Sequence, residues 1–103
     1  MGAALCKLTL VFPTAAEESL LTVLDEMEPP LPGYTTWKCS GHGDDFRHAS
    51  ASERVRGRTS RCCLVTVLDE DRAAEILQII KEEAPIAHMM FWTEPVSAAG
   101  KMS

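Results

Sequence analysis

Residues 33–68, GYTTWKCSGHGDDFRHASASERVRGRTSRCCLVTVL, decide the fold of this 103-residue chain. The two ends of the stretch are rich in Thr, Val, Cys and aromatic residues, as strands are, whereas its middle is polar and unpatterned. We therefore expect two antiparallel strands, over residues 34–40 and from about residue 54 to 68, joined by a loop over residues 41–53. A loop of about a dozen residues in so small a domain is usually functional or disordered. The stretch also holds three of the four cysteines, two of the three histidines and five of the six arginines.

Two elements are predicted before this stretch. Residues 5–12 alternate between two faces, which indicates a half-buried strand. One face carries Cys6, Leu8, Leu10 and Phe12, and the other carries Lys7, Thr9 and Val11. Pro13 ends the strand, and Thr14 and Glu17 have the spacing of a capping box. Apolar residues at helical spacing then predict a helix of about fourteen residues that ends before Pro29.

Two further elements are predicted after the stretch. A helix begins near Asp69 and is closed by Pro85; its apolar stripe is Ala73, Ile76, Leu77, Ile80 and Ala84. Residues 86–93 predict a last strand that is apolar on both faces and therefore covered on both sides. Residues 96–103 are small and polar, so we expect one domain over residues 1–95 and a flexible tail over residues 96–103.

The order strand, helix, strand, strand, helix, strand predicts an α+β, ferredoxin-like fold, with an antiparallel sheet and both helices on one face. The second face of the sheet is expected to be apolar as well, because of Val65, Val67, Met89 and Phe91. A large apolar face is rarely left to water, so we expect a symmetric assembly of copies to cover it.

Composition restricts the class of protein. A hydrophobic content of 46% and a charged content of 24% are globular values. No apolar run approaches the roughly 20 residues of a membrane span, so the chain is not expected to be membrane-embedded. Its start lacks a basic segment ahead of the apolar residues, which argues against a signal peptide and favours a cytoplasmic protein with reduced cysteines.

Charge is divided unevenly along the chain. The net charge is −5, yet residues 47–61 hold five arginines against Glu53 alone, a local balance of +4. An acidic body repels nucleic acid, so no nucleic-acid partner is expected. The basic segment suits an anion or an acidic partner surface, or it is simply a solvated hairpin stem.

Residues 33–43, GYTTWKCSGHG, and residues 53–71, ERVRGRTSRCCLVTVLDED, resemble the PII-like signalling proteins and the related CutA group. In those proteins a Gly-x-Thr strand leads into a Gly-x-Gly turn, and a returning strand leads into the second helix. The chain looks closest to the PII-like proteins that accompany heavy-metal efflux transporters. The resemblance implies a homotrimer with ligand clefts between subunits at the base of the loop. It also implies that the loop docks on a partner, such as a membrane transporter, according to ligand state.

This sequence departs from the PII-like pattern in three places, one of which is that the usual basic C-terminal ligands are missing apart from Lys101. PII proteins that bind ATP carry a glycine-rich, basic loop between the second helix and the fourth strand, whereas residues 81–86, KEEAPI, are acidic and lack glycine. Asp44 also stands where a basic residue follows the turn. These departures put the usual ATP and 2-oxoglutarate site in doubt and leave room for a smaller anion or an adenine nucleotide. The candidate ligand-binding residues are Gly41, His42, Gly43, Arg56, Arg58 and Arg61.

A soft-metal site is the alternative function. Cys39 and His42 are three residues apart, a spacing that can chelate one ion. His48 from the loop and Cys62 or Cys63 from the facing strand would complete nitrogen and sulfur ligation of Zn²⁺, Cu⁺ or Ni²⁺. Cys62 and Cys63 point to opposite faces, so only one of them can join; Cys62 is the candidate retained here. Under the plainer interpretation the cysteines are small buried hydrophobic residues and the histidines are solvated.

Partner docking and catalysis are the remaining functions to consider. Phe46 and Arg47 are candidate docking residues at the tip of the loop, unless Phe46 folds back onto the hairpin. No nucleophile with a nearby base and no phosphate-binding glycine loop can be recognised, so we expect no enzymatic activity. A third possibility is a structural subunit whose loop docks without any ligand.

Overall fold

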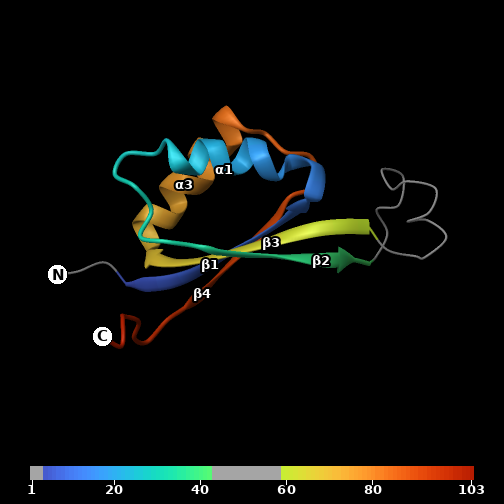
Figure 1. The fold of residues 1–103 in the computed structure, drawn as a ribbon. Coiled ribbons are helices and arrows are strands. Elements are labelled where there is room, and N and C mark those ends of the chain that lie inside the picture. The colour runs from blue at the N-terminus through green and yellow to red at the C-terminus, as the bar shows by residue number, and fades with distance from the viewer. Residues whose placement is uncertain (1–3, 43–58) are drawn as a thin grey trace.

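The computed structural model describes residues 4–42 and 59–103, and it contains one four-stranded sheet with its helices on one side (Figure 1). The elements in chain order are β1 Leu5–Pro13, a 3₁₀ turn Thr14–Ala16, α1 Glu17–Asp25, β2 Thr35–Gly41, β3 Thr59–Asp69, α3 Glu70–Glu83 and β4 Met90–Pro95. The predicted order of strands and helices is confirmed. The strands lie in the order β2-β3-β1-β4 and every neighbouring pair is antiparallel, so the fold is ferredoxin-like.

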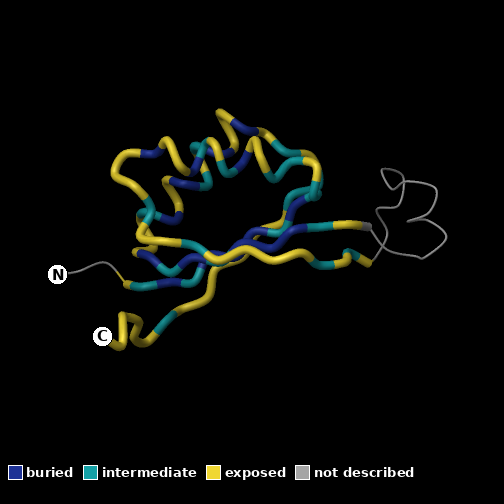
Figure 2. Tube along the Cα trace, viewed as in Figure 1, coloured by how far each residue is buried: buried dark blue, intermediate teal, exposed yellow. Residues whose placement is uncertain are grey.

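The core lies between the sheet and the two helices. The predicted alternation in β1 is confirmed: its Cys6, Leu8, Leu10 and Phe12 are buried on the helix side. The facing helices contribute Leu20, Leu24, Ala73, Ile76 and Ile80. Figure 2 shows that burial is concentrated in the central strands and the inner sides of the helices. Each large apolar side chain buried there stabilises the fold by about 1.5–3 kcal/mol, and this term holds the helices on the sheet.

The first helix is shorter than predicted and begins differently. The α-helix Glu17–Asp25 has nine residues and follows the 3₁₀ turn. The prediction of a capping box is wrong, because no side-chain hydrogen bond caps the 3₁₀ turn or α1. The Thr14 hydroxyl lies instead 2.8 Å from the Ser60 hydroxyl on β3. Thr14 therefore makes a tertiary hydrogen bond at the end of the hairpin, and not the helix-capping hydrogen bond that was predicted.

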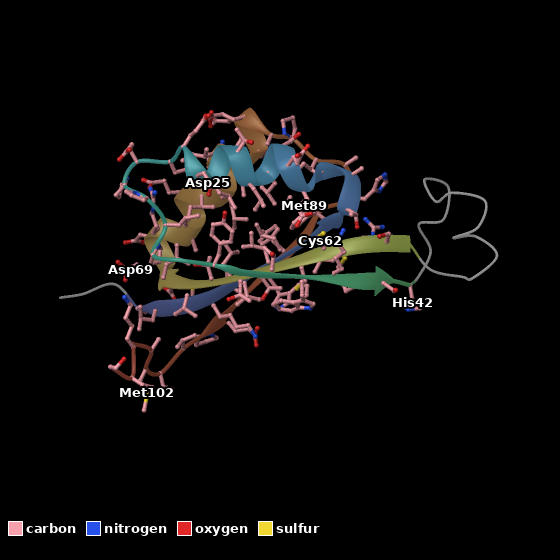
Figure 3. The ribbon with its side chains drawn as sticks, in the orientation of Figure 1. Asp25, His42, Cys62, Asp69, Met89 and Met102 are labelled. Atoms are coloured by element: carbon pink, nitrogen blue, oxygen red, sulfur yellow. The ribbon has the colours of Figure 1, made fainter. Side chains whose placement is uncertain are left out.

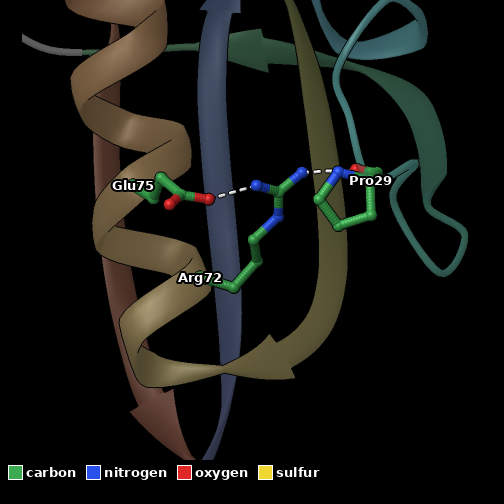
Figure 4. Close-up of polar contacts among 3 residues, drawn as sticks. All are labelled: Pro29, Arg72 and Glu75. Carbon is green, nitrogen blue, oxygen red and sulfur yellow. Dashed lines mark hydrogen bonds and ion pairs between the residues drawn. The ribbon is translucent and has the colours of Figure 1, made fainter.

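The connection from α1 to β2 is fastened at both ends. Tyr34 donates a 2.8 Å hydrogen bond from its hydroxyl to the Asp25 carboxylate at the end of α1. Arg72, in the first turn of α3, donates to the carbonyl of Pro29 and pairs with Glu75 one turn along its own helix (Figure 4). These contacts tie a proline-rich segment to α3.

The last strand begins later than predicted. It starts at Met90, and residues 84–89 form the connection from α3. Pro85 lacks an N–H group for strand pairing, and His88 has a φ of 63°, in the left-handed region. Ile86 and Met89 pack against the core from this connection.

The expectation that the last strand is covered on both sides is wrong for the single chain, because every residue of β4 is exposed. β4 is an edge strand paired with β1, and the register places Phe91 opposite Leu10 on the helix side. Met90 and Trp92, opposite Val11 and Thr9, therefore lie on the other face. The prediction that Met89 and Phe91 make that face apolar is wrong for these two residues.

None of the helices in the described residues is long and apolar enough to cross a membrane.

Candidate functional site

The base of the β2–β3 hairpin brings those predicted site residues that the structure describes to one end of the sheet. Gly41 pairs with Thr59, so residues 42–58 connect two adjacent strand ends. These ends extend past the start of α1 (Figure 1). Several predicted site residues lie outside the described residues and stay predictions: Gly43, Phe46, Arg47, His48, Arg56 and Arg58. Cys39, Gly41, His42, Arg61 and Cys62 can be placed.

Arg61 links the β2–β3 hairpin to the connection between α3 and β4. It is the cross-strand partner of both Cys39 on β2 and Pro13 on β1. Its guanidinium Nη1 donates to the His88 carbonyl at 3.4 Å, a long hydrogen bond. The bond connects the base of the hairpin to the α3–β4 connection. Neither this bond nor the turn at His88 could be read from the sequence, which placed His88 inside a strand.

A second polar cluster lies on the helix side of the hairpin base. The Cys62 thiol donates to the Thr14 hydroxyl at 3.9 Å, and that hydroxyl also meets Ser60. Burial is the largest cause of the raised pKa of Cys62; Glu17 raises it further, while Thr14 and Lys38 act in the opposite direction. Cys62 is thus a buried thiol engaged with its neighbours, which disfavours metal binding.

The two faces of the sheet separate the cysteines. Cys62 lies on the helix side with none of its surface exposed, between the sheet and the helices in Figure 3. Cys39 pairs with Arg61 and so lies on the opposite face, the one that also carries Cys63. Cys62 therefore cannot bind the same ion as Cys39, and the cysteine of β3 that can is Cys63.

His42 is exposed and follows the last residue of β2 (Figure 3). Within residues 4–42 and 59–103, no group of three or more His, Cys, Asp or Glu side chains is placed to hold a metal ion. The four-ligand metal site is thus not assembled by the described residues, and its ligand His48 lies outside them.

The sheet face away from the helices exposes several large apolar side chains. We call it the open face; its apolar residues are Val11, Trp37, Cys63, Val65, Val67, Met90 and Trp92, and Cys39 lies at its margin. Trp37, Met90 and Trp92 are 48%, 63% and 43% exposed. At its centre lies Thr9, whose buried hydroxyl has no hydrogen-bond partner among the described residues. The predicted apolar second face is confirmed, although Met90 and Trp92 supply it in place of Met89 and Phe91.

A cleft of about 510 Å³ lies between the start of α1 and the α3–β4 connection. It is lined mainly by apolar residues, among them Pro13, Ala16, Val23, Pro85 and Ile86, together with Glu83 and His88. Among the described residues its lining has no lysine or arginine. By itself this cleft offers no cation for a phosphate chain.

Comparison with known sequences places the whole chain in one group. Residues 2–103 match the family described as "Protein of unknown function (DUF3240)". No curated protein sequence matches the chain.

Solved structures share the fold at low sequence identity. A DUF3240 family protein from Shewanella baltica OS155 superposes with a TM-score of 0.77 at 16% identity, over 99% of this chain and 100% of that one. CPII, a nitrogen regulatory PII-like protein from Thiomonas intermedia K12 bound to ADP, AMP and bicarbonate, gives 0.68 at 16% identity, over 95% and 96%. A protein from Thermus thermophilus assigned to the PII-like signalling proteins gives 0.60 at 23% identity, over 91% and 88%. The fold is therefore that of the PII-like proteins.

Proposed function

The chain belongs to the DUF3240 family, and from that premise we propose that it is a PII-like regulator rather than an enzyme. It forms a homotrimer, binds a small ligand in clefts between subunits, and reports occupancy through residues 41–53 to a partner. The partner is a membrane transporter, with the heavy-metal efflux systems as the candidates to test, and the regulator acts in the cytoplasm. The observation that carries the proposal is the open face, on a fold shared with PII-like proteins.

The open face supports an assembly of copies. Two tryptophans and a methionine are about half exposed there, on the face of the sheet that the described helices do not cover. A second copy packed on this face would remove their apolar surface from water, at roughly 25 cal/mol per Å². It would also offer a partner to the Thr9 hydroxyl, whose burial without a hydrogen bond costs about 1–3 kcal/mol.

The ligand class follows from the charges near the hairpin base. The α3–β4 connection has no glycine, and the cleft beside it has no described lysine or arginine. Among the described residues, Arg61 on the hairpin is a cation whose side chain contacts this connection. One guanidinium suits a single anionic group better than a triphosphate chain. Bicarbonate, AMP and ADP, all bound by the Thiomonas intermedia protein, are therefore the ligands to test.

Signalling would work through the connection between the strand ends. Arg61 lies two residues from Thr59, the last paired residue of the hairpin, and contacts the carbonyl of His88. A ligand anion that draws the guanidinium away from this carbonyl would favour one conformation of the hairpin base. Such a ligand shifts the population of loop conformations by its differential affinity for them.

Ligand addition to the purified protein tests the proposal. We expect ADP, AMP or bicarbonate to raise the melting temperature, with about 2.7 kcal/mol of stabilisation at a concentration of 100 times Kd. Arg61→Ala should lose most of this shift, because it removes the anion partner. Lys81→Ala removes an exposed positive charge on α3 and should keep the shift. Absence of any shift in the native protein would refute ligand sensing, and an equal shift in Arg61→Ala would place the ligand elsewhere.

A further inference from the structure

Two cysteines of neighbouring strands lie diagonally on the open face. Cys39 of β2 is opposite Arg61, and Cys63 is two residues further along β3, opposite Trp37. Residues two positions apart on a strand share a face, so Cys39 and Cys63 point to the same side of the sheet. Such diagonal neighbours have Cα atoms about 7–8 Å apart and Cβ atoms somewhat closer.

This spacing is long for a direct bond between the sulfurs and suitable for a bridging ion. A disulfide needs Cβ atoms about 3.5–4.5 Å apart. Two metal–sulfur bonds of about 2.3 Å each allow the sulfurs to lie up to about 4.6 Å apart. We infer that Cys39 and Cys63 form a two-thiolate site for a soft monovalent ion of the Cu(I) class, on the face of the sheet away from the helices.

The surroundings favour a soft ion of low charge. Cys63 is 8% exposed, between Trp37 on one neighbouring strand and Val11 on the other. In the single chain Cys39 is half-buried on the edge strand β2, at the margin of the open face. Zn²⁺ in structural sites takes four ligands, and the described residues place two thiols here. Thiolates are soft ligands that favour soft ions such as Cu(I).

Binding exchanges protons for the ion. Each thiol releases its proton to solvent, and a lone pair of each sulfur then bonds to the ion, so no electron is transferred. The pKa of Cys63 is raised by burial and next by Cys39, as expected for two thiols close together, whereas Lys7 lowers it. Because each thiol gives up its proton when the ion binds, affinity should increase with pH.

Titration of the full-length protein with Cu(I), against a coloured Cu(I) chelator and without oxygen, tests the site. We expect one ion per chain, together with a change in tryptophan fluorescence, because Trp37 is the cross-strand neighbour of Cys63. Cys39→Ala removes a half-buried side chain and should abolish binding, as should Cys63→Ala. X-ray absorption of the loaded protein should show sulfur ligands alone.

Two control variants separate this site from the one expected from the sequence. Cys62→Ala removes a thiol on the opposite face, and His42→Ala removes the exposed histidine after β2. Both should keep full Cu(I) binding. Retained binding in Cys39→Ala, or loss of binding in His42→Ala, would overturn the proposal. The test does not depend on ADP, AMP or bicarbonate binding, so the regulatory function and this site can fail separately.

Discussion

At the scale of single residues, neighbouring side chains of β3 have opposite surroundings. Cys62 and Leu64 are buried under the helices, whereas Cys63 and Val65 lie on the open face. Burial raises the pKa of Cys62, and it is also the largest cause of the raised pKa of Cys6. Both thiols are therefore held neutral in the folded chain more firmly than in the unfolded one.

The raised pKa values predict how stability changes with pH. The unfolded chain ionises these thiols near the ordinary value of 9.0, while the folded chain does so at higher pH. Their contribution to stability is thus fully present below pH 9.0 and is lost as the pH rises through the folded pKa values. Chemical denaturation between pH 7 and 11 should show a shallower fall of the unfolding free energy in Cys62→Ala than in the native protein.

Leu64→Ala is the matched control for that experiment. It also shortens a buried side chain of β3, and it should cost about 2–5 kcal/mol at every pH without changing the slope. An unchanged slope in Cys62→Ala would show that its thiol does not couple to folding.

At the scale of elements, side-chain hydrogen bonds join helices, strands and connections that are distant in sequence. The hairpin end is joined to α1 through Thr14 and Ser60, and to the α3–β4 connection through Arg61. Arg72 similarly joins α3 to the connection before β2. These contacts cross between elements distant in sequence.

Replacement of Arg72 tests the tie between α3 and the α1–β2 connection. The Arg72 side chain is 16% exposed, and its guanidinium contacts both Pro29 and Glu75. We expect Arg72→Ala to lower the unfolding free energy by about 1–3 kcal/mol, because hydrogen bonds to a charged group are lost. Limited proteolysis should also become faster within residues 26–34. Gln78→Ala, which removes an exposed hydrogen bond to Glu82 on the same helix, should change stability by less than about 0.5 kcal/mol. Equal effects of the two substitutions would contradict the role given to Arg72.

At the scale of the whole molecule, one face of the sheet is covered by its own helices and the other is not. The proposed trimer predicts that light scattering coupled to gel filtration gives the mass of three chains of 11.3 kDa. Trp92→Glu puts a charge on the open face and should release monomers that remain folded, because Trp92 is already 43% exposed in the single chain.

Met102→Glu is the control for the assembly, since it alters a fully exposed apolar residue in the C-terminal segment. It should leave the trimer intact. A monomeric native protein, or a Trp92→Glu variant that stays trimeric, would rule out assembly through the open face.

Local pattern alone determined the number, type and order of the elements, and which residues of β1 face the helices. Alternation and helical spacing can be read directly from the sequence. Pro13, Pro29 and Pro85 limit helices and strands because proline has no N–H group to donate. The tertiary structure decided where β4 begins, because Ile86 and Met89 satisfy an apolar pattern equally well by packing from a connection. It also decided which cysteine accompanies Cys39. Alternation places Cys62 and Cys63 on opposite faces, but only the pairing of β2 with β3 determines which of those faces Cys39 shares.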